Sequence, residues 1–344
     1  MEQKIIEKIV KASGIEPGES VLLHFWGEDT AKATANAFMV SIAALGGSPV
    51  LLQEARTLNR DIFSQASEDC FGEAYFERLA SFDTVLDVFA YQPIVLGYDL
   101  ESEKFTLYRN YMANLFRTLL TAKRFLQIRL PTIENAQESS LPPDKFVQRM
   151  TAAYDIDFDA LRSACEKKAD RLKQYDQLAI ETGDHALLQF DLAGRAWHID
   201  AGDGDWPCGE VYIAPNEEKT QGEIFFETLY IDDVGRFDHV RLYVRQGVLL
   251  GSSDEKVNEY LKNLKTSDKT VCELGFGMNP HITEACGYTV LDEKILGSFH
   301  IAIGENTLFG GCNQASQHID LVNTGKFTII QSERKKDYDD SPQY

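Results

Sequence analysis

The stretch that decides the fold runs from residue 20 to residue 54 and reads SVLLHFWGEDTAKATANAFMVSIAALGGSPVLLQE. It opens with SVLLHF, a continuous apolar run of strand length, and continues into an alanine-rich segment that Asp29 or Thr30 can cap. The Gly46-Gly47 pair ends this segment, and SPVLLQE follows as a second apolar run. Strand, helix and strand in this order predict a βαβ unit with parallel strands.

Two later apolar runs extend the same pattern. FDTVLDVFAY (82–91) and RFLQIRLP (124–131) are typical of buried strands, and we predict a helix over residues 103–122 between them. We therefore predict an open α/β sheet in an N-terminal domain. A charged helical segment, residues 141–175, extends this domain, which covers residues 1–176.

From about Gln177 the pattern changes to alternating apolar and polar residues. LLQFDLAGRAWHID and HVRLYVRQGVLLGSS alternate in this way and are interrupted at A-G-R and R-Q-G, which predicts a β-hairpin in each. Only residues 254–265 have the pattern of a clear helix. We predict a β-rich α+β domain over residues 177–332, followed by a disordered tail over residues 333–344.

Composition and charge narrow the function classes. The net charge of −20 argues against nucleic acid or an anionic membrane as a partner. The six cysteines include no C-x-x-C pair, which favours a reducing cytoplasm over a disulfide framework. The N-terminal MEQKIIEKIVKASG lacks the apolar core of a signal peptide, and no stretch approaches the ~18 apolar residues that span a bilayer. We therefore expect a cytoplasmic protein.

The residues with chemical potential lie in the last third of the chain. Three of them stand alone in apolar segments: Glu210 in WPCGEVYIAP, Glu273 in CELGFGMNP and His300 in LDEKILGSFHIAIG. In QHIDL, His318 and Asp320 are two residues apart, so on a strand they would project from the same face. Such groups converging from apolar strands would be costly to bury without a cation, and one or two divalent metal ions would provide it.

Each of these residues also has an ordinary explanation. A glutamate after a glycine at a strand start is usually on the surface, a lone buried histidine is usually hydrogen-bonded within the core, and an H-x-D alternation is usually a solvated strand face. No G-x-S-x-G, Walker A or H-E-x-x-H motif is present. The remaining histidines are expected to be structural or on the surface, with His198 and His281 as candidates for lining a cleft: His24, His185, His198, His239 and His281.

Five segments between about Gln189 and Val322 resemble the metallo-aminopeptidases of the aminopeptidase T and aminopeptidase S type. They are DLAGRAWHID, WPCGEVYIAP, CELGFGMNP, LDEKILGSFHIAIG and GGCNQASQHIDLV, in the order of that family. The resemblance implies a homodimer with a pair of divalent metals held by two glutamates, two histidines, an aspartate and a tyrosine. It places the first five of these ligands at Glu210, Glu273, His300, His318 and Asp320.

The sequence departs from this family at the tyrosine. It is expected seven residues after His300, where this chain has Thr307, whose hydroxyl is shorter and far less acidic than a phenol. A second group on the same scaffold, the 2,5-dihydroxypyridine 5,6-dioxygenases, binds one Fe(II) with two histidines and an aspartate. Their H-x-D resembles His318 and Asp320, but their first histidine falls on Glu273. The sequence therefore lies between the two groups.

The reading that we favour is a metal-dependent hydrolase that resembles an aminopeptidase and acts on a small molecule or short peptide. A water activated by zinc, cobalt or manganese would attack an amide carbonyl, and Glu210 or Glu273 would relay the proton to the leaving amine. The alternative is a mononuclear non-haem Fe(II) oxygenase acting on a small hydroxylated aromatic, with His318, Asp320 and either Glu273 or His300 as ligands. A scaffold that binds without turnover is a third possibility.

Overall fold

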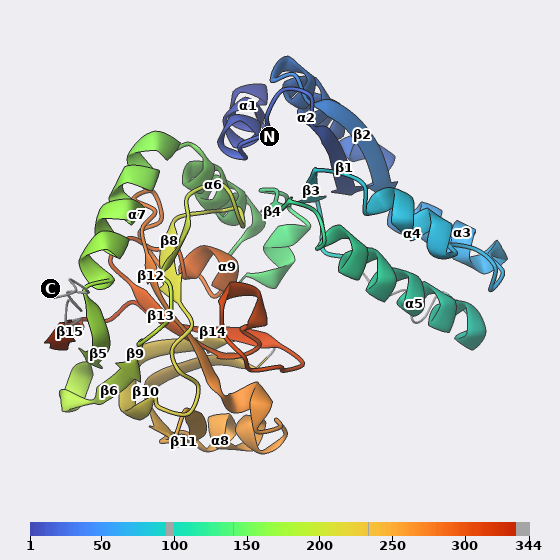
Figure 1. The fold of residues 1–344 in the computed structure, drawn as a ribbon. Helices are drawn as coiled ribbons and strands as arrows, with labels where there is room; N and C mark the ends of the chain where they lie inside the picture. Colours follow the sequence, from blue (N-terminus) through green and yellow to red (C-terminus); the bar gives the residue numbers. More distant parts are fainter. Residues whose placement is uncertain (94–99, 140, 233, 335–344) are drawn as a thin grey trace, which may run out of the picture. The chain divides into compact units, whose positions relative to one another are not determined.

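The computed structural model describes residues 1–93, 100–139, 141–232 and 234–334 (Figure 1). The chain forms two compact units, and each unit is made of two separate stretches of the sequence. Unit 1 contains residues 1–158 and 201–208, and unit 2 contains residues 159–200 and those from 209 onward. The sequence had placed the domain boundary at residue 176. In the structure, the helix α7 (Phe158–Leu172) belongs almost entirely to unit 2.

Unit 1 is built on a parallel sheet of four strands in the order β2-β1-β3-β4. The two central strands, β1 (Ser20–Trp26) and β3 (Thr84–Phe89), are buried almost throughout, which explains their continuous apolar sequence. This confirms the predicted open α/β sheet. The other elements of the unit are α1 (Gln3–Ala12), α2 (Lys32–Ala44), β2 (Ser48–Glu54), α3 (Arg56–Gln65), α4 (Glu73–Leu79), α5 (Ser102–Leu119), β4 (Arg124–Arg129) and α6 (Pro143–Tyr154).

A polar cluster interrupts the apolar core of unit 1. His24 on β1 is completely buried, and its Nδ1 atom lies 2.8 Å from Asp87 on β3, the residue opposite in the sheet register. Its Nε2 atom lies 3.9 Å from Glu54, which also accepts a hydrogen bond from the hydroxyl of Tyr111. Burial alone would lower the pKa of His24, but Asp87 and then Glu54 outweigh it and raise the pKa to about 9.

We therefore expect unit 1 to lose stability as the pH rises. The pKa of His24 is about 9 in the folded state against 6.5 for a free histidine, so its stabilisation is complete below about pH 6.5 and is lost as the pH passes 9. Urea unfolding at about pH 6 and about pH 9.5 measures this difference.

The matched variant is Asp87→Asn, which removes the charge that holds the proton on His24. It should lower the free energy of unfolding at neutral pH by about 3 kcal/mol and remove most of this pH dependence. An unchanged pH dependence in Asp87→Asn would show that His24 is not its source.

Unit 2 contains two packed sheets. The larger has six strands in the order β11-β10-β9-β6-β5-β15, and the smaller has five antiparallel strands in the order β14-β13-β12-β8-β7. Apolar side chains from both sheets form a single core cluster, for example Phe226 and Leu242 from the first and Leu274 and Ile301 from the second. The site described below lies on the smaller sheet.

The strands of the larger sheet are β5 (Tyr175–Glu181), β6 (Leu187–Asp191), β9 (Gln221–Ile231), β10 (Gly235–Arg245), β11 (Val248–Ser252) and β15 (Thr328–Arg334). Those of the smaller sheet are β7 (His198–Asp200), β8 (Glu210–Ile213), β12 (Val271–Gly277), β13 (Phe299–Gly304) and β14 (His318–Asn323). The helices α8 (Glu255–Lys262) and α9 (Thr289–Asp292) complete the unit.

One of the two predicted hairpins is wrong. β10 and β11 pair across R-Q-G as expected, but the strands on either side of A-G-R belong to different sheets. β6 pairs with β5 and β9, whereas β7 pairs with β8. Gly194 does adopt a positive φ of 74°, so the turn signal is real. A turn signal fixes a local reversal of the chain, not the partner of the strand that follows.

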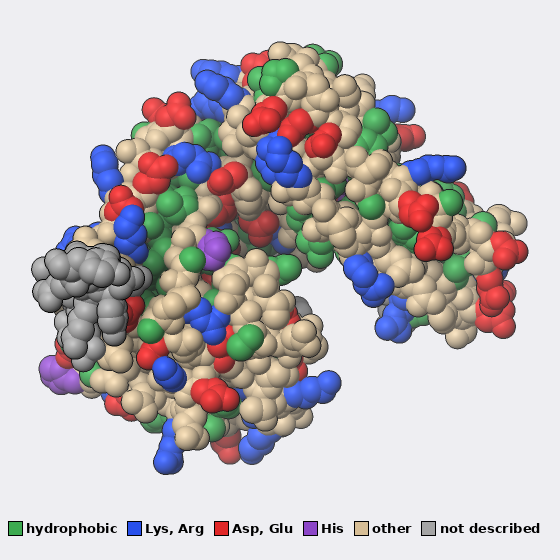
Figure 2. Space-filling view, in the orientation of Figure 1, with side chains coloured by type: hydrophobic (Ala, Val, Ile, Leu, Met, Phe, Trp, Pro, Cys, Tyr) green, Lys and Arg blue, Asp and Glu red, His purple; other side chains and the backbone are tan. Residues whose placement is uncertain are grey.

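The last strand of the larger sheet reaches into the predicted tail, residues 333–344. β15 extends to Arg334, and the rest of the tail, residues 335–344, lies outside the described residues. Within the described ranges, no helix combines the length and the apolar character that crossing a membrane requires. Figure 2 shows acidic and basic side chains interspersed over one face.

Candidate metal centre

The polar residues of the smaller sheet share the face that points away from the apolar core. In the register of β8 and β12, Tyr212 lies opposite Gly275, and on the other side Gly275 lies opposite His300. Further along, Asp320 and His318 of β14 pair with Ala302 and Gly304 of β13. Directly paired residues of an antiparallel sheet project to the same side, and residues two apart in a strand do so too. Glu210, Glu273, His300, His318 and Asp320 therefore meet on one surface.

A β-bulge brings Glu273 to this face. Val271 pairs with Ile303 on the core side, and the register then shifts so that Glu273 pairs with Ala302. Strict alternation from Val271 would have turned Glu273 into the core. The extra residue, Cys272, reverses the alternation, and bulges next to functional sites commonly re-aim a side chain in this way.

Gly275 makes room for the imidazole of His300. A Cβ atom on this glycine would lie 2.1 Å from the Nε2 atom of His300, well inside the contact distance of any two such atoms. The neighbouring positions on β13, Ala302 and Gly304, are also small. Small residues between the ligand-bearing positions allow the large polar side chains to converge above the sheet.

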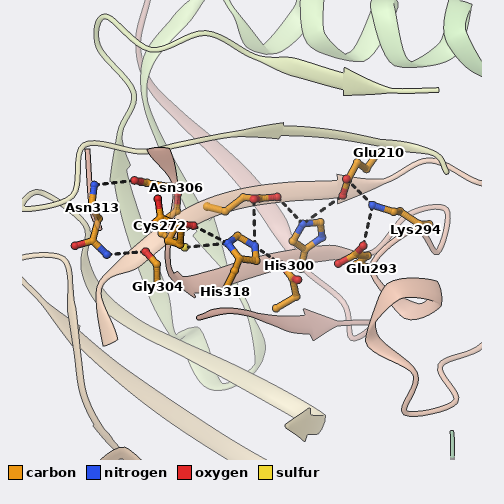
Figure 3. Close-up of polar contacts among 12 residues, drawn as sticks. Glu210, Cys272, Glu293, Lys294, His300, Gly304, Asn306, Asn313 and His318 are labelled. Atoms are coloured by element: carbon orange, nitrogen blue, oxygen red, sulfur yellow. Dashed lines mark hydrogen bonds and ion pairs between the residues drawn. The ribbon is translucent and has the colours of Figure 1, made fainter. Parts of the chain in front are cut away.

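The five side chains form one continuous chain of contacts (Figure 3). The Nε2 atom of His300 lies 3.1 Å from Glu273 and 3.5 Å from Glu210. The Nε2 atom of His318 lies 3.5 Å from the second oxygen of Glu273 and 3.3 Å from Asp320. Two groups of possible metal ligands result, each with its atoms within 4.8 Å of one another. They are Glu210, Glu273 and His300, and Glu273, His318 and Asp320.

The second group fits a divalent cation. The Nδ1 atom of His318 lies 2.8 Å from the backbone carbonyl of Glu305, which can only accept, so Nδ1 carries the proton of the neutral ring. In the neutral ring the Nε2 lone pair faces oxygens of Glu273 and Asp320, so either a second proton on the ring or a metal cation must separate these three acceptors. Imidazole and carboxylate donors suit zinc, manganese, cobalt or iron. The carbonyl behind His318 orients the ring as the partners of metal-binding histidines usually do.

The same deficit of positive charge is visible in the pKa values. Burial alone would lower the pKa of His318, but Asp320 and its other neighbours raise it well above 6.5. Burial raises the pKa of Glu210, and burial followed by the charge of Glu293 raises that of Asp320. Without a metal ion, protons take the place of the missing positive charge.

The loop that follows β13 is held in place by two asparagines. The side chain of Asn306 donates to Glu217 at 3.0 Å and to the carbonyl of Cys272 at 3.2 Å, and its oxygen accepts the backbone N–H of Asn313. The side chain of Asn313 donates to the carbonyl of Gly304 at 2.6 Å (Figure 3). These bonds fix the segment that supplies the Glu305 carbonyl to His318.

The structure adds two residues that the sequence analysis missed, Glu293 and Lys294. Glu293 forms a third group of possible ligands with His300 and Asp320. The ammonium of Lys294 lies 2.5 Å from Glu210 and 2.8 Å from Glu293, and both residues are buried. Burial works against the ionised form of Glu293, but Lys294 lowers its pKa below the usual range. The available signal was the charged D-E-K triplet at 292–294, inside the otherwise apolar segment that leads into β13.

Thr307, His198 and His281 each have identifiable contacts in the structure. The hydroxyl and the backbone N–H of Thr307 both bind the carboxylate of Glu305, and its side chain is exposed. His198 stacks on Tyr212 with the ring centroids 5.4 Å apart. His281 is exposed, and its backbone N–H donates to Asn279.

Known proteins show the same fold and family. The family model of the thermophilic metalloproteases, M29, matches residues 125–338, which is more than half of the chain. The chain therefore belongs to this family of metallopeptidases, which use divalent metals. A comparison with curated proteins gave no match.

Two solved structures share the fold over nearly the whole chain. Wild-type AmpT from Thermus thermophilus is 18% identical, with a TM-score of 0.71 over 95% of this chain and 94% of that one. The 2,5-dihydroxypyridine dioxygenase from Pseudomonas putida KT2440 is 16% identical, with a TM-score of 0.63 over 96% of this chain and 94% of that one. The resemblance to both groups found in the sequence is thus confirmed.

Replacing Gly275 tests the packing of the site. In Gly275→Ala the new methyl group would displace His300, which lies 3.1 Å from Glu273 and helps to orient it, so we expect metal affinity to fall by about 10- to 100-fold and stability by about 1–3 kcal/mol. Isothermal titration with Zn²⁺ and thermal unfolding measure the two effects. Gly72→Ala is the control, because a Cβ there meets nothing within 4 Å at an ordinary φ of −70°. Equal metal affinity in both variants would contradict the role of Gly275.

Proposed function

We propose that the chain is a metal-dependent hydrolase of the aminopeptidase type. The observation that carries this proposal is the group of Glu273, His318 and Asp320, whose possible ligand atoms lie within 4.8 Å of one another, joined through Glu273 to a second group with Glu210 and His300. Membership of the metalloprotease family supports the same reading. These five residues would hold one or two divalent ions.

The exposure of the two histidines indicates from which side a substrate would reach the site. His318 has 31% of its side chain exposed, whereas His300 is completely buried, so a substrate would approach from the His318 side. Zinc, cobalt or manganese bound here would supply the Lewis acidity that activates water and polarises an amide carbonyl. Glu273 would fix the spacing of the site, because its two oxygens face the two imidazoles.

We assign the proton relay to Glu210. Its Oε1 atom is bound by Lys294, but its buried Oε2 atom accepts no hydrogen bond from any described residue. This oxygen lies 3.5 Å from the Nε2 atom of His300 without a hydrogen bond, whereas the Oε1 atom of Glu273 lies within hydrogen-bond distance of the same nitrogen, at 3.1 Å. A carboxylate in this situation can take up a proton and pass it to a leaving amine.

Aromatic rings beside His318 form a surface for an apolar part of the substrate. Phe309 lies edge-on to His318 with centroids 5.9 Å apart and edge-on to Tyr212 at 5.5 Å. Tyr212 in turn stacks on His198. We propose that this row of rings receives the apolar side chain of a short peptide, since aromatic faces contribute large buried contact areas.

The runner-up is a mononuclear Fe(II) oxygenase for a small hydroxylated aromatic molecule. The group of Glu273, His318 and Asp320 could hold one iron with positions left open for oxygen and substrate. It contains one histidine, however, whereas the usual facial triad has two. His300 reaches Asp320 only in the separate group with Glu293. The donor set therefore favours the hydrolase.

The test combines metal loading with substitutions of the ligands. Protein loaded separately with zinc, cobalt and manganese should cleave aminoacyl-p-nitroanilides with at least one of them. In Glu273→Ala and His318→Ala, both cleavage and bound metal should fall by at least about 100-fold, because a direct ligand is removed. Metal analysis and a colorimetric assay provide the two readouts.

The matched controls are His185→Ala and Glu218→Ala, which remove exposed residues of unit 2. The side chain of His185 is 96% exposed, so its loss should change neither readout. Absence of cleavage with every metal would refute the hydrolase. Oxygen uptake by the iron-loaded protein with a dihydroxylated aromatic would establish the runner-up instead.

A further inference from the structure

Lys294 places a buried positive charge inside the carboxylate cluster. Only 2% of its side chain is exposed, and its ammonium contacts Glu210 at 2.5 Å and Glu293 at 2.8 Å (Figure 3). Asp200, from the adjacent strand β7, lies 4.0 Å away. Lysine is among the residues least often buried, and when buried it is paired with an opposite charge. Its position is therefore set by these carboxylates.

The site divides into two halves with different sources of positive charge. We call Glu210, His300, Glu293 and Lys294 the closed half, and Glu273, His318 and Asp320 the open half. The closed half contains its own cation. Among the residues that the structure describes, no lysine or arginine forms an ion pair with any member of the open half.

Exposure distinguishes His318 and Asp320 from the closed half. Every side chain of the closed half is at least 90% buried, and so is Glu273 at 7% exposed, whereas His318 is 31% exposed and Asp320 is 16% exposed. An ion that acts on a substrate needs open coordination positions that water and substrate can reach. Only the open half offers them.

A second divalent ion in the closed half would meet the ammonium of Lys294. It would have to share Glu210 with Lys294, because one oxygen of this carboxylate is already taken by the ammonium. Like charges that share a ligand in a buried, low-dielectric environment repel each other strongly. The lysine and a second ion therefore compete for the same negative charge.

We propose that Lys294 takes the place of a second metal ion, so that the centre binds one divalent ion, held by Glu273, His318 and Asp320. The ammonium offsets one of the two negative charges of Glu210 and Glu293 and holds the Oε1 atom of Glu210 in place. This inference rests on the metal centre of the proposed function and adds its stoichiometry. It makes Glu210 a residue that acts beside the ion, not one of its ligands.

Metal counting tests the proposal without an activity assay. Protein saturated with Zn²⁺ and freed of excess ion by gel filtration should contain one zinc per chain by plasma mass spectrometry. In Lys294→Met, Glu210 and Glu293 lose their cation, and the count should rise to two. Lys294→Arg keeps the charge and should stay at one, and His318→Ala should fall to none.

Two zinc ions in the unaltered protein, or one in a folded Lys294→Met variant, would overturn the proposal. If Lys294→Met does not fold, anomalous X-ray scattering from crystals of the unaltered protein soaked in Zn²⁺ decides the matter. One peak between Glu273, His318 and Asp320 is expected. A second peak between Glu210 and His300 would contradict it.

The proposal of one ion per chain and the proposed hydrolase reaction can be refuted independently of each other. One zinc per chain without amide cleavage would refute the proposed function and leave the role of Lys294 standing. Two zinc ions per chain together with amide cleavage would refute the role of Lys294 and support the proposed function. The Lys294→Met and Lys294→Arg pair thus concerns the closed half, whereas the ligand substitutions concern the reaction.

Discussion

The constraint on which the site depends is the concentration of carboxylates above one face of a β-sheet. Glu210, Glu273, Glu293 and Asp320 all belong to groups whose ligand atoms lie within 4.8 Å of one another. Negative charges at such distances cannot be buried together without cations, because each loses its hydration and repels the others. Lys294 supplies one positive charge from within the chain. Among the described residues, no lysine or arginine pairs with the open half, and a divalent ion is a cation that its imidazole and carboxylate donors suit.

The five-stranded sheet meets this constraint by separating its two faces. One face contributes Leu274 and Ile301 to the apolar core, and the other carries the polar side chains. The hydrogen-bonded register sets the spacing of the five candidate ligands, so their geometry does not depend on flexible loops. Where alternation alone would have failed, the bulge at Cys272 corrects the direction of Glu273. The loop pinned by Asn306 then adds the carbonyl that orients His318.

The sequence predicts local features well and pairing between distant segments poorly. The βαβ unit and the shared face of His318 and Asp320 follow from periodicities of a few residues, and both are present. The convergence of Glu210, Glu273 and His300 depends on which strands pair, and only the family resemblance indicated it. The hairpin at A-G-R failed for the same reason. Glu293 and Lys294 precede β13 in an irregular segment, where no period separates a buried charge from an exposed one.

Thr307, the departure from the expected tyrosine, has a structural explanation in this chain. Its hydroxyl and backbone N–H bind one oxygen of the Glu305 carboxylate, and the other oxygen accepts the N–H of Ala315. Glu305 thereby ties together the two ends of the loop before β14, and its backbone carbonyl accepts a hydrogen bond from the Nδ1 atom of His318. Thr307 thus acts on the site through Glu305, by fixing the histidine that faces the ion. With Lys294 as the cation of the closed half and Thr307 as a support for the open half, the chain departs from a symmetric pair of metal sites at both ends.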